Sequence, residues 1–157
     1  MAKARGLKPE EWEFWDTWMR AQRLLMRELD RGLQDDCGIS KAEFSVLVSL
    51  WQAPGREMRV GELADSLNWE KSRVSHLLTR MENRGFVART QFGASGRRTG
   101  IGLTEEGRRV AKTSIDAHGG NIRRHVLDSL TPEQAATIRA WSEQMIDRIE
   151  PPRGDVP

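Results

Sequence analysis

The sequence predicts a mainly α-helical fold with a small β wing, of the α+β class. Apolar residues recur with helical spacing along most of the chain. The spacing changes to a clear alternation in one region, between residues 86 and 103, which predicts a hairpin. A chain of 157 residues, 38% hydrophobic and 31% charged, is about one domain long and can bury a core.

The first helix is expected to begin near Pro9 or Glu10, with acidic residues in its first turn as the helix dipole favours. Apolar residues form two stripes along it. The longer stripe has spacings of three and four and consists of Trp12, Trp15, Met19, Met26, Leu29 and Leu33. The shorter stripe beside it consists of Phe14, Trp18 and Leu25. Two stripes indicate two buried faces. The second face could pack on a partner helix, or a small domain could wrap around the whole helix.

A second helix is expected after Ser40, because Ser40-Lys41-Ala42-Glu43 has the pattern of a capping box. Pro54-Gly55 ends this helix, and residues 58–60 are long enough only for a single bridging strand. Residues 61–67 predict a short helix, followed by a turn at Asn68-Trp69. The residues expected to face inward are Phe44, Leu47, Val48, Leu50 and Trp51 in the second helix, then Leu63, Ala64 and Leu67 in the short one.

The stretch NWEKSRVSHLLTRMENRGFV, residues 68 to 87, predicts a longer helix of unusual composition. Its apolar residues lie on one face: Val74, Leu77, Leu78 and Met81. The residues between them are small or hydrogen-bonding, where a surface helix usually mixes Glu with Lys: Ser72, Arg73, Ser75, His76, Thr79 and Arg80. Gly85 supplies a left-handed cap at the end of the helix.

The rest of the chain predicts a hairpin and two helices. Residues 86–90 form one strand, 91–98 a loop, and Thr99, Ile101 and Leu103 mark a returning strand. A long helix capped at residues 104–106 is expected to run to about Ser129, with close packing or a bend at Gly119-Gly120. Thr131-Pro132-Glu133-Gln134 opens the last helix. The apolar stripe of that helix is Ile138, Trp141, Met145, Ile146 and Ile149.

A short helix, a tight turn, a longer helix and a hairpin together predict a winged helix-turn-helix at residues 40–103. In such a unit the longer helix enters the major groove of DNA and the hairpin loop reaches the minor groove. Arginine, hydroxyl and imidazole groups can bond to bases or phosphates, whereas Glu on that face would repel DNA. The candidate DNA-binding residues are Lys71, Ser72, Arg73, Ser75, His76, Thr79 and Arg80, with Arg97 and Arg98 at the wing tip.

The charge distribution favours a polyanion as the partner of this middle region. Residues 56–98 hold nine basic and five acidic residues, for +4, although the whole chain carries only +2. The alternative is a solvated helix face and a solvated turn, in which case the chain would be a winged-helix protein-interaction module that does not read DNA.

Two segments closely resemble the MarR family of bacterial transcriptional regulators: VGELADSLNWEKSRVSHLLTRMENRGFVART, followed by GRRTGIGLTEEG. LTPEQAATIRAWSEQM resembles that family's final helix. The resemblance implies one MarR-like domain over residues 1–157 and a homodimer joined by helices near 10–35 and 105–149. It also implies binding to a pseudo-palindromic operator and repression of nearby genes. Family wings usually carry an Asp where this chain has Ser95, so the wing holding Arg97 is expected to be less braced.

The resemblance also implies release of DNA by a small aromatic or hydrophobic effector bound between the dimer helices and the winged region. Four tryptophans could help line such a pocket: Trp12, Trp15, Trp18 and Trp51. Aromatic residues at helical spacing are more often part of a core, so both interpretations remain open.

Other chemistry is not expected. Cys37, the only cysteine, falls in the expected link after the first helix, where an inert free thiol fits better than a redox sensor. His118 and His125 are seven residues apart without a third ligand, so no metal site is expected. Neither a catalytic arrangement nor a phosphate-binding glycine loop is present, which predicts no enzyme activity and no cofactor. No apolar run approaches the roughly 20 residues of a membrane span, and no secretory signal is recognisable, so the cytoplasm is expected.

Overall fold

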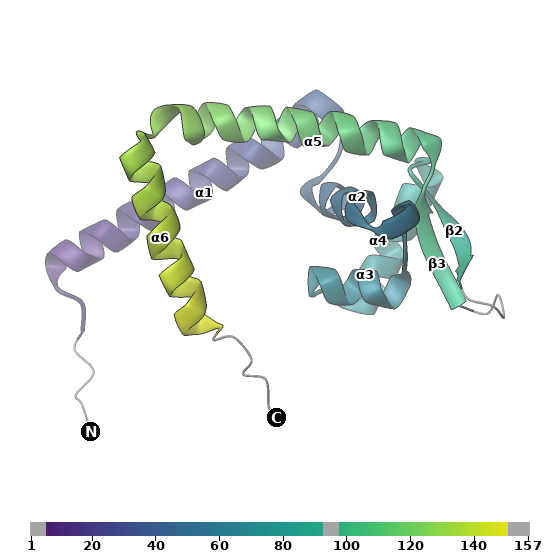
Figure 1. Ribbon diagram of the computed structural model, residues 1–157, viewed down its shortest axis with the longest axis horizontal. Coiled ribbons are helices and arrows are strands. Elements are labelled where there is room, and N and C mark those ends of the chain that lie inside the picture. The colour runs from purple at the N-terminus through teal and green to yellow at the C-terminus, as the bar shows by residue number, and fades with distance from the viewer. Residues whose placement is uncertain (1–5, 93–97, 151–157) are drawn as a thin grey trace, which may run out of the picture. The chain divides into compact units, whose positions relative to one another are not determined.

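The computed structural model describes residues 6–92 and 98–150, and it confirms a mainly helical chain with a small antiparallel sheet (Figure 1). Its elements are α1 (Pro9–Cys37), α2 (Lys41–Gln52), β1 (Glu57–Arg59), α3 (Val60–Leu67), α4 (Lys71–Asn83), β2 (Val87–Phe92), β3 (Arg98–Leu103), α5 (Glu105–His125) and α6 (Pro132–Ile149). Short 3₁₀ turns occupy Pro54–Arg56 and Leu127–Ser129. The chain divides into two compact units, Met1–Gly119 and Gly120–Pro157.

Helix α1 begins at Pro9 as expected, where the backbone N–H of Lys8 donates to the Glu11 carboxylate at 2.7 Å. The helix ends about two residues later than the expected 10–35. Gly38 adopts a left-handed φ of 65° and its N–H donates to the carbonyl of Gln34 at 2.9 Å, so the helix continues as far as Cys37. The expectation that Cys37 lies in a link is therefore wrong. Burial, together with the neighbouring Asp36 carboxylate, raises the pKa of its thiol.

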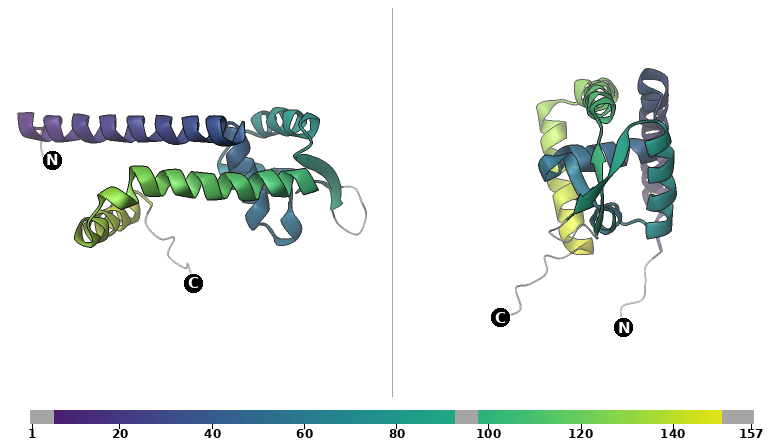
Figure 2. Two further views of the ribbon diagram at one scale, coloured as in Figure 1. Left: turned by 90° about the horizontal axis from the view of Figure 1, so that it is seen from above. Right: turned by 90° about the vertical axis from the view of Figure 1, so that its right-hand side faces the viewer.

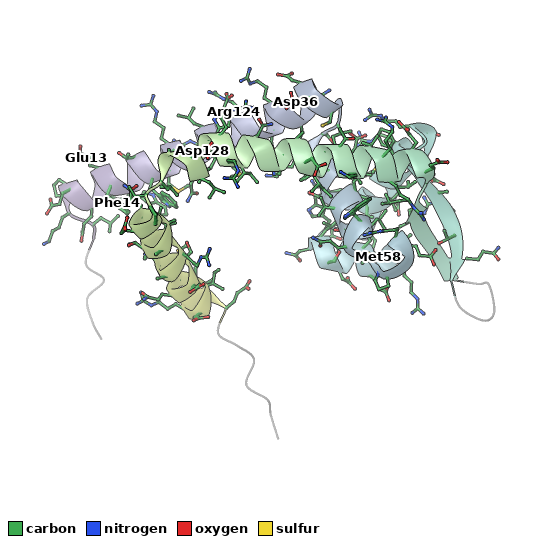
Figure 3. The ribbon with its side chains drawn as sticks, turned by 45° about the horizontal axis from the view of Figure 1, so that its top comes forward. Glu13, Phe14, Asp36, Met58, Arg124 and Asp128 are labelled. Carbon is green, nitrogen blue, oxygen red and sulfur yellow. The ribbon has the colours of Figure 1, made fainter. Side chains whose placement is uncertain are left out.

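Only the C-terminal part of α1 reaches the core. Leu29 and Leu33 are buried, whereas Phe14, near the other end of the helix, is 62% exposed. Figure 3 labels Phe14 and Asp36 at the two ends of this helix.

The capping box of α2 is confirmed. The hydroxyl of Ser40 accepts the Glu43 N–H at 3.2 Å, and the Glu43 carboxylate accepts the Ser40 N–H at 2.8 Å. The helix directs Val46, Leu47 and Leu50 fully into the core. Val46 was not among the residues expected inside, because α2 is apolar around most of its circumference and spacing alone cannot select the buried face.

Strands β2 and β3 form the wing hairpin, and β1 adds a short third strand in the order β1-β3-β2, all antiparallel. The ladders pair Met58 with Ile101, and Val87 with Leu103 through Phe92 with Arg98. Figure 2 shows the strands of the hairpin side by side. The bridging strand covers 57–59 rather than 58–60. The hairpin strands reach Phe92 and resume at Arg98, so the expected loop at 91–98 was too long.

The core of the first unit joins the C-terminal part of α1, helices α2, α3 and α4, the sheet and the start of α5. Its fully buried members include Leu33, Leu47, Leu63, Leu78 and Ile101. Each buried side chain of this size contributes about 1.5–3 kcal/mol relative to an exposed one. This core holds α4 and the wing in one framework.

Helix α5 begins after Thr104, whose hydroxyl accepts the Gly107 N–H at 2.9 Å and donates to the Gly85 carbonyl at 2.6 Å. It ends at His125 rather than near Ser129, because Val126 leaves helical geometry with φ −125°. Of the two alternatives expected at Gly119-Gly120, close packing within the described chain is absent, since an added Cβ at either would meet no atom within 4 Å; the bend stays a prediction.

Helix α6 lies in the second unit and starts with the capping box expected at Thr131 and Gln134. It has no buried residue. None of the described helices combines the length and the apolar character needed to cross a membrane.

Candidate nucleic-acid interface

Helix α4 is fixed by one apolar face. Val74, Leu77, Leu78 and Met81 are each at most 2% exposed, as the spacing predicts. The helix packs through them on α2 and α3, which lie beside it in Figure 1. Because this face is held by the core, the opposite face of α4 is directed to solvent.

The solvent face of α4 carries the helix residues expected to contact DNA. All seven are exposed: Lys71, Ser72, Arg73, Ser75, His76, Thr79 and Arg80. Thr79 donates its hydroxyl hydrogen to the Ser75 carbonyl at 3.1 Å, which leaves its oxygen able to accept. The face thus presents hydrogen-bond donors and cationic groups in a rigid helical arrangement. We call these seven residues the α4 donor face.

The first turn of α4 offers backbone donors. Its N-cap residue, Glu70, makes no side-chain capping bond, so the first amides of the helix are not capped from that side chain. An open depression of about 510 Å³ adjoins this turn. Its lining includes Lys71 and Ser72 but also Asp65 and Glu70, whose carboxylates oppose an anion. A phosphate here would rely on Lys71 and the helix dipole.

Two arginines of the basic middle region are already engaged within the protein. Arg84 donates to the Glu43 carboxylate at 2.7 Å and to the Gly38 carbonyl at 2.8 Å. Arg89 pairs with Glu82 at 3.1 Å. Their charges are therefore partly neutralised by ion pairs that join the end of α4 to α2 and to β2. With Arg84 and Arg89 paired, the cations of the α4 donor face make up a larger share of the unpaired positive charge than the count of basic residues in 56–98 indicates.

Trp69 is a feature of this surface that sequence reasoning assigned only to a turn. The guanidinium carbon of Arg73 lies over its ring, 4.1 Å from the centroid. The tryptophan also packs against the core, so it joins the interior of the unit to the α4 donor face. The signal that could have found it is the spacing of four between Trp69 and Arg73.

The wing tip is only partly within the described residues. Arg97 and Ser95 lie outside them. Arg98 is the first residue of β3 and pairs with Phe92 in the ladder, so its backbone belongs to the strand rather than to the loop.

The four tryptophans considered for an effector pocket lie in two different places. Trp12, Trp15 and Trp18 are on the part of α1 that precedes its buried residues, with Trp12 and Trp15 exposed. Trp51 lies in α2, packs against the core and has the guanidinium of Arg56 4.2 Å from its ring centroid.

A separate crevice of about 460 Å³ opens between α2, β1 and α3, and its lining is mainly apolar. It is lined by Ser49, Gln52, Ala53, Pro54, Glu57, Met58, Glu62 and Ser66, with none of these tryptophans. Figure 3 labels Met58 in this region.

His118 packs its ring against Phe44, with centroids 4.7 Å apart. Burial lowers the pKa of its imidazole and Lys41 lowers it further, while Asp30 raises it; the net shift is downward. Its Nδ1 has no hydrogen-bond partner among the described residues. In residues 6–92 and 98–150, no group of three or more His, Cys, Asp or Glu side chains is arranged to hold a metal ion.

Comparison with known proteins agrees with this architecture. The model of the MarR family matches residues 39–99, which contain the α4 donor face. Transcriptional regulator HosA of Escherichia coli O127:H6 is 30% identical over 109 residues, which are 69% of this chain and 78% of HosA.

Two crystal structures from Streptomyces coelicolor, both of MarR family transcriptional regulators, are also similar. AbsC superposes with a TM-score of 0.81 at 31% identity, covering 93% of this chain and 98% of AbsC. Sco3205, determined in complex with DNA, superposes with a TM-score of 0.82 at 32% identity, covering 100% and 98%. Sequence and fold together place this chain in the MarR family of transcriptional regulators.

Proposed function

We propose that this protein is a sequence-specific DNA-binding repressor that acts as a homodimer on a pseudo-palindromic operator. The observation that carries the proposal is the α4 donor face. It is exposed and rigidly held, and it presents donors at the position of the helix that enters the major groove in winged helix-turn-helix proteins. The related Sco3205, crystallised with DNA, supports this use of the fold.

A homodimer is supported by apolar surface that the single chain leaves exposed. Trp12, Phe14 and Trp15 on α1 are each at least 46% exposed. Ile146 and Ile149 on α6 are 56% and 72% exposed. Soluble monomers rarely expose so many large apolar side chains along a helix. In a two-fold dimer the two α4 helices would enter successive major grooves, roughly 34–36 Å apart.

The wing is proposed to add minor-groove contacts through Arg97 as its principal residue and Arg98 beside it. Arginine favours a narrow minor groove, where the negative potential of DNA is enhanced. We place this activity in the cytoplasm, with no cofactor and no catalytic step.

A small aromatic or hydrophobic effector is proposed to release the operator. The crevice between α2, β1 and α3 supports it, because Ala53, Pro54 and Met58 offer apolar surface in a concave site beside polar groups that can orient a ligand. The exposed tryptophans of α1 remain a second candidate, which requires the partner chain to complete the pocket.

The alternative function is a winged-helix protein-interaction module that does not read DNA. Selection of duplexes from a random library, followed by anisotropy titrations from 50 to 200 mM salt, separates the two. A repressor should enrich an inverted repeat, and its affinity should fall by roughly 10³-fold or more over that range if six or more phosphates are contacted. No enrichment, or affinity independent of salt, would reject DNA reading.

A further inference from the structure

Three arginines lie at the two ends of α4: Arg73 in its first turn, Arg80 in its last turn and Arg84 at its C-cap. They differ in the contacts that their side chains make within the protein. Arg84 lies with its guanidinium carbon 4.6 Å from the ring centroid of Phe86, but its donors are engaged by Glu43 and Gly38. Arg80 is exposed, and no aromatic ring lies against it among the described residues. Arg73 alone of the three combines a ring contact with N–H donors that no protein acceptor occupies in the part of the chain that is described.

The backbone around Trp69 explains why its ring can hold Arg73. Asn68 takes a left-handed φ of 52°, and the Trp69 N–H donates to the Ala64 carbonyl at 3.0 Å, which closes the turn after α3. The indole then packs against the core. Side chains on an α-helix lean toward its N-terminus, so Arg73, in the first turn of α4, reaches back over the residue four positions before it.

The contact keeps Arg73 ready for a planar acceptor. An ion pair would occupy its donors, whereas contact with a ring face restrains the long side chain and leaves them available. Restraint before binding also reduces the entropy lost when the side chain is ordered on DNA, an effect of roughly 2- to 10-fold in affinity for one long side chain. Guanine is the base whose major-groove edge presents two acceptors that arginine can bind together.

We propose that Trp69 is a positioning residue that holds Arg73 over its ring so that Arg73 reads a guanine in each half of the operator. The inference rests on the proposed function and adds to it the base read by this part of α4. It also distinguishes Arg73, restrained before binding, from Arg80, which is ordered only on contact with DNA.

A double-mutant cycle on the full-length protein tests the coupling, with affinities measured by anisotropy on the selected operator and on a scrambled duplex. Trp69→Leu keeps an apolar side chain against the core and removes the aromatic face; Trp69→Phe keeps a ring. We expect Trp69→Leu to weaken operator binding by roughly 2- to 10-fold and Trp69→Phe to restore most of it, with the scrambled duplex unaffected.

The cycle partners decide the mechanism. In an Arg73→Ala background, Trp69→Leu should cause no further loss, whereas in the matched Arg80→Ala background the two losses should multiply. Equal effects of Trp69→Leu in both backgrounds would overturn the positioning role. The base pair at which Arg73→Ala loses discrimination should be G·C; loss at an A·T pair would overturn the assignment of guanine.

A spectroscopic measurement in the absence of DNA separates this inference from the proposed function. The side-chain δ protons of Arg73 should show an upfield ring-current shift in the NMR spectrum, absent in Trp69→Leu and retained in Trp69→Phe. A missing shift in the wild type would overturn the inference alone. A shift that is present in a protein that selects no duplex would overturn the proposed function, and with it the reading of guanine, while leaving the contact intact.

Discussion

At the scale of single residues, Gly107 has the least room for a side chain among the glycines that the structure describes. It lies in the first turn of α5, where a Cβ would come within 1.8 Å of the Phe86 carbonyl oxygen and 2.8 Å of its carbon. Both are backbone atoms, at the point where the chain leaves α4 for β2, so neither can move without shifting the strand. The close approach is what allows α5 to start directly beside the wing.

Gly107→Ala is therefore expected to lower the free energy of unfolding by about 3 kcal/mol, through overpacking against fixed backbone. Gly119→Ala in the same helix is the matched control: its Cβ would meet no atom within 4 Å, and it should stabilise the helix by about 0.5–1 kcal/mol. Urea unfolding followed by circular dichroism, at one protein concentration, measures both. Similar stabilities for the two variants would show that α5 does not start as described.

Glu43 and Arg84 form the other decisive residue contact, a link between α2 and the end of α4. Burial by itself would raise the pKa of Glu43, but hydrogen bonds from Ser40 and Arg84, with the charge of Arg84, outweigh it and hold the pKa below its usual value. Glu43 is only 8% exposed as a residue, and loss of its charge would leave the Arg84 guanidinium without its main partner.

This link should make stability depend on pH. A folded-state pKa below the unfolded value means that the contribution is fully present above the unfolded pKa of about 4.3 and is lost as pH falls through the lower folded pKa. We expect Glu43→Gln to lower the free energy of unfolding at pH 7 by about 1–3 kcal/mol, with the difference from wild type shrinking below about pH 4.3.

Denaturant titrations at several pH values between 7 and 3 measure the effect. Glu106→Gln is the control, because Glu106 pairs with Arg109 on an exposed helix surface and should matter little at any pH. If Glu43→Gln runs parallel to wild type across the whole range, the link does not depend on the ionised carboxylate.

At the scale of elements, the sequence predicts best what depends on neighbours along the chain. The buried face of α4 follows from the helical spacing of its four apolar residues. The start of α2 follows from the capping pair Ser40 and Glu43. The sequence predicts the ends of helices less well, because backbone geometry at single residues determines them. One glycine, Gly38, extends α1 past its expected end, while Val126 leaves helical geometry and shortens α5 without any glycine or proline to mark the position.

Contacts between distant residues could not be predicted from local pattern. Glu43 and Arg84 are 41 residues apart, and nothing in either segment specifies the other. Arg84 and Arg89 therefore counted toward a basic surface, although each is paired within the protein. Within the candidate site, the helix residues were predictable as a group because helical periodicity separates inside from outside, whereas the restraint on Arg73 required the three-dimensional turn at Trp69.

For α4 as an element, we expect its first turn and its middle to contribute differently to binding. His76→Ala, in the middle of the α4 donor face, should weaken operator binding by about 1–3 kcal/mol while leaving non-specific binding nearly unchanged, if it contacts bases. Lys71→Ala, at the helix start, should weaken both equally and reduce the salt slope by about one, as for a phosphate contact. Anisotropy on operator and scrambled duplexes over a salt series distinguishes them. Uniform loss in His76→Ala would assign that residue to the backbone instead.

At the scale of the whole molecule, the distribution of apolar side chains separates two kinds of surface. The winged part of the first unit buries its apolar residues in one core. Most large apolar side chains in the N-terminal two-thirds of α1 and in α6 are exposed, although Trp18, Met19 and Leu25 are half-buried, and α6 has no buried residue at all. Helices capped and patterned as well as these need an apolar partner for stability, since capping alone contributes only about 1 kcal/mol. A second copy of the chain is the partner we propose.

Sedimentation equilibrium should then give twice the chain mass of 17.9 kDa. Phe14→Glu places a charge on the most exposed aromatic residue of α1 and should weaken dimerisation by about 2 kcal/mol or more, because a carboxylate is costly to bury in an apolar interface. Operator affinity should fall with it, since two α4 helices on one particle bind far more tightly than one.

Glu13→Gln, on the neighbouring exposed residue, removes a charge without adding one to the stripe and should remain dimeric. Circular dichroism distinguishes a folded monomer from an unfolded chain, and either is consistent with a dimer that completes the fold. A wild-type monomer, or a Phe14→Glu variant that stays dimeric with full affinity, would show that α1 does not form the interface.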